Sequence, residues 1–166
     1  MIRRKLGLIV ISLMVVSGCA GAPESTESSL GTSRISILDG DATSRRYTLF
    51  LRQPDGTWFH GGGRQAFEGN APRAMAMTAA DRDSITTALR QAGWLDGNLD
   101  LDEGTGPRYL EVSMTGNVVD RRFSMLAVDG GFDPRTEAVL SILQEIAGQR
   151  YRGVLDALPK GRPSSR

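Results

Sequence analysis

The residue whose type and position most clearly indicate chemistry is Cys19, the only cysteine in the chain. It follows two small residues, and ahead of them lie a basic cluster, Arg3 to Lys5, and an apolar run from Leu6 to Val16. A basic end, a short apolar stretch and small residues at a cleavage point form an export signal. A lone cysteine also gives the chain no internal disulfide and no cysteine-rich metal site, so the domain relies on its core.

Val16-Ser17-Gly18-Cys19 resembles the lipobox of bacterial lipoproteins. The resemblance implies that Cys19 receives a thioether-linked diacylglycerol, that residues 1–18 are removed as a signal peptide, and that the new amino terminus is acylated. Several acyl chains anchor a protein stably, and the basic cluster orients the chain so that its body lies outside the cytoplasm. The residue after the cysteine is Ala20, not the Asp that commonly holds lipoproteins at an inner membrane. The resemblance therefore favours the outer membrane in a cell that has two.

Three other interpretations of the N-terminus remain open. A secretory peptide cut after Ala22 would place Pro23 directly beyond the scissile bond, where its ring hinders cleavage. An uncleaved membrane helix needs about 20 apolar residues, but the strongly apolar stretch stops at Val16. The third interpretation is a cytosolic protein whose apolar start is fortuitous.

Composition favours a single domain with one ordinary core, since 40% of the residues are apolar. From residue 19 onward there are 17 Lys and Arg against 19 Asp and Glu, which gives no basic surface for nucleic acid. Residues 19–33 are rich in small and polar residues and predict a flexible tether to the domain at 34–158. Residues 159–166 predict a disordered tail, with contact to anionic envelope polymers or lipid headgroups as the alternative.

The segment His60-Gly61-Gly62-Gly63 resembles the oxyanion-hole segment of some esterases. Such a segment works beside a serine on a Gly-x-Ser-x-Gly turn and a separate base histidine. The chain contains neither that turn nor a second histidine. We therefore expect a glycine-rich loop leaving a strand, and no catalytic residue.

Metal chemistry is limited in the same way, because zinc sites usually need several His or Cys ligands. Calcium is the one metal to consider, since acidic and amide residues alternate through Asp96–Glu103 as at the start of an EF-hand loop. Leu101 replaces the glycine that this loop requires, and Pro107 replaces its bidentate glutamate. We expect a solvated loop with its leucines turned inward and neither metal nor cofactor, with calcium as the alternative.

Trp58, Phe59 and His60 form the candidate interaction surface, next to the glycine run. Adjacent strand residues point to opposite faces, so one of the two aromatic side chains is exposed or covered by a loop. Burial beneath the Arg64–Pro72 loop is the simpler interpretation. The alternative is a contact with a protein or a glycan.

The elements that position these residues follow from periodicity and capping signals. Pro54-Asp55-Gly56 predicts a tight turn and Gly116-Asn117 a two-residue hairpin turn. Apolar alternation and these turns predict strands at 34–39, 47–52, 57–60, 74–77, 109–114 and 118–128.

Two helices are predicted from their ends and apolar faces. Thr78 is a suitable N-cap with Asp81 three residues on, and Gly93 a suitable stop, after which Trp94 should fold back onto the core. Asp133-Pro134 begins the last helix. That helix either ends near Gly148 or is followed by a final turn or short helix carrying Tyr151, Val154, Leu155 and Leu158.

The predicted fold class is α+β, an antiparallel sheet of hairpins with two helices packed on one face. The order of elements resembles a group of uncharacterised small bacterial envelope α+β domains, with which it shares the Asp-Gly hairpin, a middle helix ending in an Ala-Gly-aromatic step, a second hairpin and a terminal helix. The matching parts are Pro54-Asp55-Gly56, residues 78–94 and the half that begins at Tyr109. That group has no established activity to transfer.

These observations predict a membrane-anchored envelope lipoprotein whose domain is a non-catalytic binding or interaction module. Its expected partners are membrane lipid, through acylated Cys19, and an envelope protein or polymer, but not nucleic acid. One alternative is a small envelope enzyme whose site assembles from scattered carboxylates or glycine-loop N–H groups. A purely structural lipoprotein is another. A pocket of converging titratable groups would favour the enzyme, and an exposed apolar patch near Trp58 the interaction module.

Overall fold

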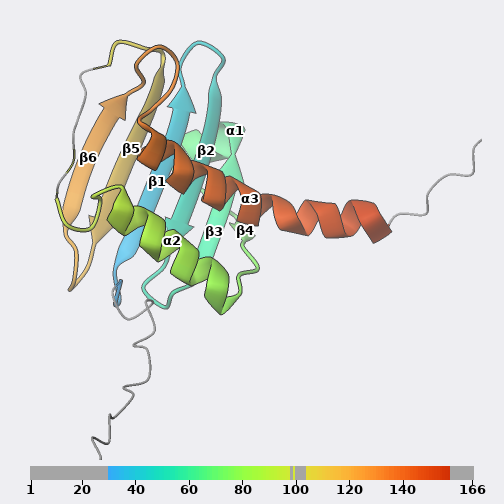
Figure 1. Ribbon diagram of the computed structural model, residues 1–166. Helices are drawn as coiled ribbons and strands as arrows, with labels where there is room; N and C mark the ends of the chain where they lie inside the picture. The colour runs from blue at the N-terminus through green and yellow to red at the C-terminus, as the bar shows by residue number, and fades with distance from the viewer. Residues whose placement is uncertain (1–29, 98, 100–103, 158–166) are drawn as a thin grey trace, which may run out of the picture.

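Six antiparallel strands form one sheet, and helices α2 and α3 cover one of its faces (Figure 1). The computed structural model describes residues 30–97, 99 and 104–157, with side chains described up to residue 149. The sheet has the order β4-β3-β2-β1-β5-β6. Its strands are β1 (Arg34–Asp41), β2 (Arg46–Arg52), β3 (Trp58–Gly62), β4 (Arg73–Ala74), β5 (Arg108–Thr115) and β6 (Arg121–Leu126). The helices are α1 (Gly63–Phe67), α2 (Ala79–Gln91) and α3 (Pro134–Ala157). The predicted α+β fold is therefore confirmed.

The hydrophobic core lies between the sheet and the two long helices. The register places Ile37 on β1 beside Phe50 on β2 and Val112 on β5, and all three side chains are buried. Leu89 of α2 and Leu143 of α3 are buried in the same cluster. The alternating strand residues and the apolar helix faces that the sequence indicates thus meet in one core.

Helix α2 begins and ends at the predicted residues. The Thr78 side chain accepts a hydrogen bond from the Asp81 N–H, and the Asp81 carboxylate accepts one from the Thr78 N–H, which makes a capping box. At the other end Gly93 has a φ of 74°, and the Trp94 N–H donates to the Leu89 carbonyl. This is a Schellman ending. It turns Trp94 back into the core, where its side chain is fully buried.

Helix α3 also begins as predicted but continues further than Gly148. The Asp133 carboxylate accepts hydrogen bonds from the N–H groups of Arg135 and Thr136, and Pro134 occupies the first helical position. The helix runs without a break to Ala157, and its last turns extend past the edge of the sheet (Figure 1). A glycine inside a helix costs only about 1 kcal/mol relative to alanine, which explains why Gly148 does not end this one.

The turn between β2 and β3 has the predicted Asp-Gly geometry. The Asp55 carboxylate accepts a hydrogen bond from the Thr57 N–H, and Gly56 has a φ of 87°. This bond, together with the Thr57 side chain, lowers the pKa of Asp55 below its usual value. The turn sets the antiparallel register of the two strands.

The domain begins earlier than the predicted boundary at residue 34. Leu30 is buried in the core cluster, and Ser33 is also buried. The guanidinium of Arg52 donates hydrogen bonds to the carbonyl oxygens of Ser33, at 2.6 Å, and Gly31, at 3.0 Å. Residues 30–33 therefore belong to the domain, because backbone contacts that composition does not reveal hold them.

The second hairpin has a longer connection than the predicted two-residue turn. Strand β5 ends at Thr115 and β6 begins at Arg121. The Asn117 side chain accepts hydrogen bonds from the backbone N–H and hydroxyl of Thr32, at 3.4 and 3.0 Å. The residues expected to form a tight turn and the start of a strand instead pack on the N-terminal segment.

Two small elements also differ from the prediction. The Arg64–Pro72 segment, expected as a loop, starts with the five-residue helix α1, and β4 covers only Arg73 and Ala74. Helix α1 packs on β2 and β3, on the face opposite α2 and α3 (Figure 1). A helix this short has no apolar periodicity by which the sequence could indicate it.

Candidate functional site

The sheet face opposite α2 and α3, called the outer face below, carries a graded set of side chains. Its residues alternate with the core residues along β1, β2, β5 and β6. Because neighbouring strands are in register, these side chains form rows that cross the sheet. The type of side chain changes from one row to the next, so the two ends of the outer face along the strands differ in composition.

The first row is aromatic. Across the sheet it consists of Tyr47 on β2, Gly40 on β1, Tyr109 on β5 and Leu126 on β6, each paired with the next. Phe67 of α1 adds a third ring, whose centroid lies 4.9 Å from that of Tyr47. Phe67 is 61% exposed and Leu126 45% exposed. We call Tyr47, Tyr109 and Phe67 the aromatic row; the two tyrosines are half-buried.

Gly40 allows the aromatic row to form. A Cβ atom at this position would lie 2.5 Å from Cζ of Tyr109, well inside normal carbon contact distances. The Tyr109 ring therefore lies over the backbone of β1, in the space that a side chain at residue 40 would fill. Burial, the nearby Tyr47 and the charge of Glu111 raise the pKa of the Tyr109 phenol, so it stays a neutral hydrogen-bonding group.

The following rows become progressively more polar. The second crosses Leu49, Leu38, Glu111 and Ser124, and the third crosses Leu51, Ser36, Ser113 and Arg122. Arg34, at the start of β1, pairs with Thr115 beyond them. The outer face thus changes from aromatic, through aliphatic and acidic, to hydroxyl-bearing and basic towards the end where β1 begins.

A cavity of about 340 Å³ opens on this face between the second and third rows and α1. Its walls include the apolar side chains of Leu38, Leu49 and Phe67, and its polar atoms come from residues such as Glu111 and Arg122. Apolar residues together with a few polar groups are the usual lining of a small-ligand site.

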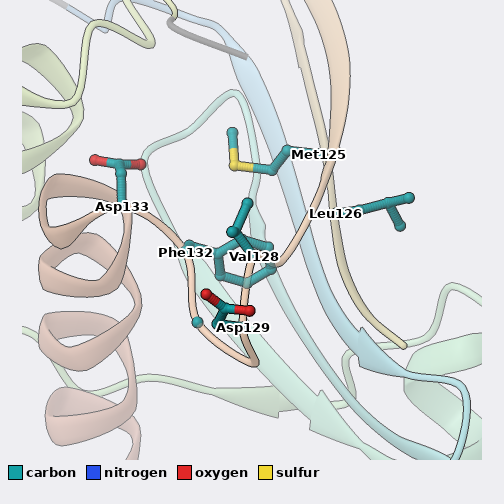
Figure 2. A pocket seen from close by; sticks show the side chains of 7 residues that line it. Met125, Leu126, Val128, Asp129, Phe132 and Asp133 are labelled. Atoms are coloured by element: carbon teal, nitrogen blue, oxygen red, sulfur yellow. The ribbon is translucent and has the colours of Figure 1, made fainter. Parts of the chain in front are cut away.

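A second hollow, of about 300 Å³, lies where β6 leads into α3 (Figure 2). It is lined by Met125, Leu126, Val128, Asp129, Gly131, Phe132 and Asp133. Figure 2 shows Met125 and Leu126 pointing to opposite sides of β6, so Leu126 extends towards the outer face. Asp129 has a φ of 50° in a tight turn closed by the bridge between Val128 and Gly131.

An ion cluster beside this hollow fixes α3 to the sheet. The Arg108 guanidinium donates to the Asp39 carboxylate, with a shortest distance of 3.1 Å, and to Glu137 at 2.6 Å. It also lies 4.6 Å from the centre of the Phe132 ring. Burial opposes the Arg108 charge, but the two carboxylates raise its pKa overall. Since the Arg108 guanidinium pairs with both carboxylates, the cluster is a structural connection between β1, β5 and α3.

The predicted interaction surface of Trp58, Phe59 and His60 does not form one patch. Trp58 is 2% exposed and belongs to the core, and His60 points to the same side of the sheet. Phe59 points to the outer face opposite Leu51 and is half-buried. In this fold Trp58 cannot contribute to a surface contact, because the core beneath the helices holds its side chain.

His60 and the glycines after it take part in ordinary secondary structure. Burial lowers the pKa of His60, with the charge of Arg73 adding to the effect. Gly61 and Gly62 pair with β2, and Gly63 begins α1 with a φ of 61°. A Cβ at Gly61 would overlap the Asn70 carbonyl oxygen. Because Gly61 has no side chain, the segment that follows α1 can approach β3 closely.

Several predicted features lie outside the described residues. These are Cys19, most of the tether, the tail at 159–166, and most of the Asp96–Glu103 segment. Of that segment, Leu99 packs against the core cluster, as expected for an inward-facing leucine. Within the part of the chain that the structure describes, no group of three His, Cys, Asp or Glu side chains could hold a metal ion. No helix among these residues is long and apolar enough to span a membrane.

No protein-family model matches the sequence, and no curated protein matches it either.

The aromatic row was missed at the level of sequence, although part of its signal is visible there. The alternation of Tyr47, Leu49 and Leu51 against Thr48 and Phe50 is evident, but it does not say which set faces the helices. Tyr109 lies beside Tyr47 only because β1 pairs with both β2 and β5. No local pattern predicts that pairing.

Proposed function

We propose that the protein is an exported, lipid-anchored module that binds a component of the cell envelope through the outer face of its sheet. One observation carries the binding role. A row of three aromatic rings, of which Phe67 is exposed and the two tyrosines are half-buried, lies on the sheet face that α2 and α3 leave uncovered, next to a cavity lined by both apolar and polar residues. Large side chains at a surface, beside a few convergent polar groups, are characteristic of a recognition site.

The anchoring half of the proposal is supported by the lipobox-like Val16-Ser17-Gly18-Cys19 and the basic cluster ahead of it. Its test is the intact mass of the protein extracted from the producing cell, compared with that of a Cys19→Ser variant. We expect the wild-type mass to equal the chain from Cys19 plus acyl groups, and the variant to lack the acyl mass. A full-length chain, or an unmodified chain that starts beyond Cys19, would contradict lipid anchoring.

The binding half is tested with the soluble chain of residues 20–166, which keeps every described residue. Sedimentation with an envelope fraction of the producing cell measures binding, and Phe67→Ala removes the most exposed ring of the row. We expect affinity to fall about 5-fold or more, because truncating a residue that matters in an interface costs about 1 kcal/mol or more. The matched control is Val118→Ala, which truncates a residue that is 52% exposed and lies outside the outer face.

Two outcomes would overturn the binding role. In the first, the wild-type chain stays in the supernatant at every protein concentration, which means that no envelope component retains it. In the second, Phe67→Ala and Val118→Ala sediment equally with the wild type, which means that the outer face plays no part. Circular dichroism of both variants verifies that a loss of binding does not arise from unfolding.

A further inference from the structure

We propose that the envelope component is an uncharged polysaccharide whose sugar rings stack on the aromatic row. The inference rests on the binding role proposed above and names the chemical class of the ligand. The residues that carry it are Tyr47, Tyr109 and Phe67, together with Glu111, one cross-strand row away.

The arrangement of the rings provides a platform of the right form. Phe67 and Tyr47 are 4.9 Å apart between centroids, and the Tyr109 ring lies over Gly40, the residue between the two tyrosine strands. Adjacent strands lie about 5 Å apart, so the Tyr109 ring over β1 lies beside Tyr47 on β2. The three rings therefore form one continuous platform on which the pyranose rings of a sugar chain can stack.

The chemistry of the row matches the two sides of a sugar. The C–H faces of a pyranose carry partial positive charge and are attracted to the negative faces of aromatic rings. Its hydroxyl groups need donors and acceptors at the edge of the platform. The phenol hydroxyls of Tyr47 and Tyr109 can do both, and the Glu111 carboxylate accepts hydrogen bonds only. An aliphatic ligand would leave these polar groups without partners.

Charge on the outer face favours a neutral chain over an anionic one. Successive rows are about 7 Å apart along the strands, so Glu111 lies about that distance from the aromatic row. Arg122 belongs to the third row, but it lines the same cavity as Glu111 and Phe67. On α1, Arg64 forms an ion pair with Glu68. Charges of both signs therefore lie near the platform and offset one another, so it offers no net positive charge to a phosphate or carboxylate.

The extent of the apolar surface favours a sugar chain over a protein. Among the described residues, four large hydrophobic side chains are exposed: Phe67 and Leu126 on the outer face, Val128 two residues beyond Leu126, and Val118 in the β5–β6 connection. A stable protein interface buries about 800 Å² on each partner around an apolar centre. A narrow row of rings with hydroxyl groups at its edge is better suited to a chain that is itself narrow and hydroxylated.

Isothermal titration calorimetry of residues 20–166 tests the inference with three defined compounds. Cellotetraose and tetra-N-acetylchitotetraose are the neutral probes, and polygalacturonate is the anionic comparison. We expect at least one neutral probe to bind, with tighter binding than polygalacturonate. Phe67→Leu and Tyr47→Leu, which keep apolar volume but remove a ring, should each weaken binding about 2- to 13-fold, the factor that corresponds to one aromatic contact. Val118→Leu should leave affinity unchanged.

Several results would overturn the polysaccharide inference. These are binding of polygalacturonate alone, binding of neither neutral probe, or equal affinity of the wild type and both ring variants. If, in addition, Phe67→Ala sediments less with the envelope fraction than the wild type does, the binding role stands and the partner is a protein or an anionic polymer. If the envelope fraction does not retain the wild type either, the proposed function fails with it.

Discussion

Replacing Gly40 by alanine should push the Tyr109 ring out of the aromatic row. The added Cβ would lie 2.5 Å from Cζ and 2.8 Å from the hydroxyl oxygen of Tyr109. Overpacking of this kind costs about 1–3 kcal/mol, and we expect the lower half of that range because the crowded atoms lie at the free end of a side chain. Gly40 does not have a positive φ, so alanine recovers about 0.4–1 kcal/mol by restricting the unfolded chain. The net loss of unfolding free energy should be about 1 kcal/mol.

The same substitution should change sign when Tyr109 is absent. In a Tyr109→Ala background the clash disappears, and Gly40→Ala should stabilise the protein by about 0.4–1 kcal/mol. The wild type, the two single variants and the double variant form a double-mutant cycle, in which we expect a coupling free energy of about 1–2 kcal/mol between residues 40 and 109. Urea unfolding followed by tryptophan fluorescence measures it, since Trp58 and Trp94 are both buried and should report global unfolding.

A matched control separates the clash from a general effect of glycine replacement. Gly62→Ala would bring a Cβ no closer than 3.8 Å to the Tyr47 carbonyl oxygen, so its effect should be the same with and without Tyr109. If Gly40→Ala changes stability equally in both backgrounds, the ring does not lie over β1 and the reasoning is refuted.

Three further predictions concern stability. Thr78→Ala should lower the unfolding free energy by about 1 kcal/mol through loss of the α2 cap; an unchanged urea midpoint would contradict the cap. Arg108→Met should cost about 1–3 kcal/mol, because it leaves the largely buried Asp39 carboxylate unpaired, whereas Arg64→Met at an exposed ion pair should cost under about 0.5 kcal/mol. Equal losses of stability for the two variants in thermal melts would argue against the ion cluster. The lowered pKa of His60 means that the unfolded chain binds a proton more readily, so stability should fall as pH decreases from above 6.5 through that lowered pKa. His60→Gln should flatten this dependence in urea titrations at several pH values.

The sequence was most informative where structure depends on neighbouring residues. Thr78, Gly93 and Asp133 act on backbone groups within a few positions of themselves, so their types and spacing sufficed to locate helix ends. Trp94 returned to the core for the same local reason. The fold class followed because these ends, together with strand alternation, left few arrangements that bury all the apolar faces.

The remaining features depend on contacts between distant residues. Residues 30–33 resemble a tether in composition, and only the hydrogen bonds from Arg52 and the packing of Leu30 make them part of the domain. The candidate site depends on such contacts even more. Its rings come from β2, β5 and α1, and they meet only because Gly40 on the central strand carries no side chain.

The buried Arg52 clamp on residues 30–33 also determines how the domain would respond to mechanical load. The clamp lies at the start of β1, whereas the aromatic row crosses the far end of the same strand at Gly40. A pull between the N-terminal segment and a ligand on that row would run nearly parallel to β1. The hydrogen bonds to β2 and β5 lie across that direction, so they would be sheared together instead of opening one at a time. Tension on the chain would therefore be shared by the two longest strand pairings of the sheet.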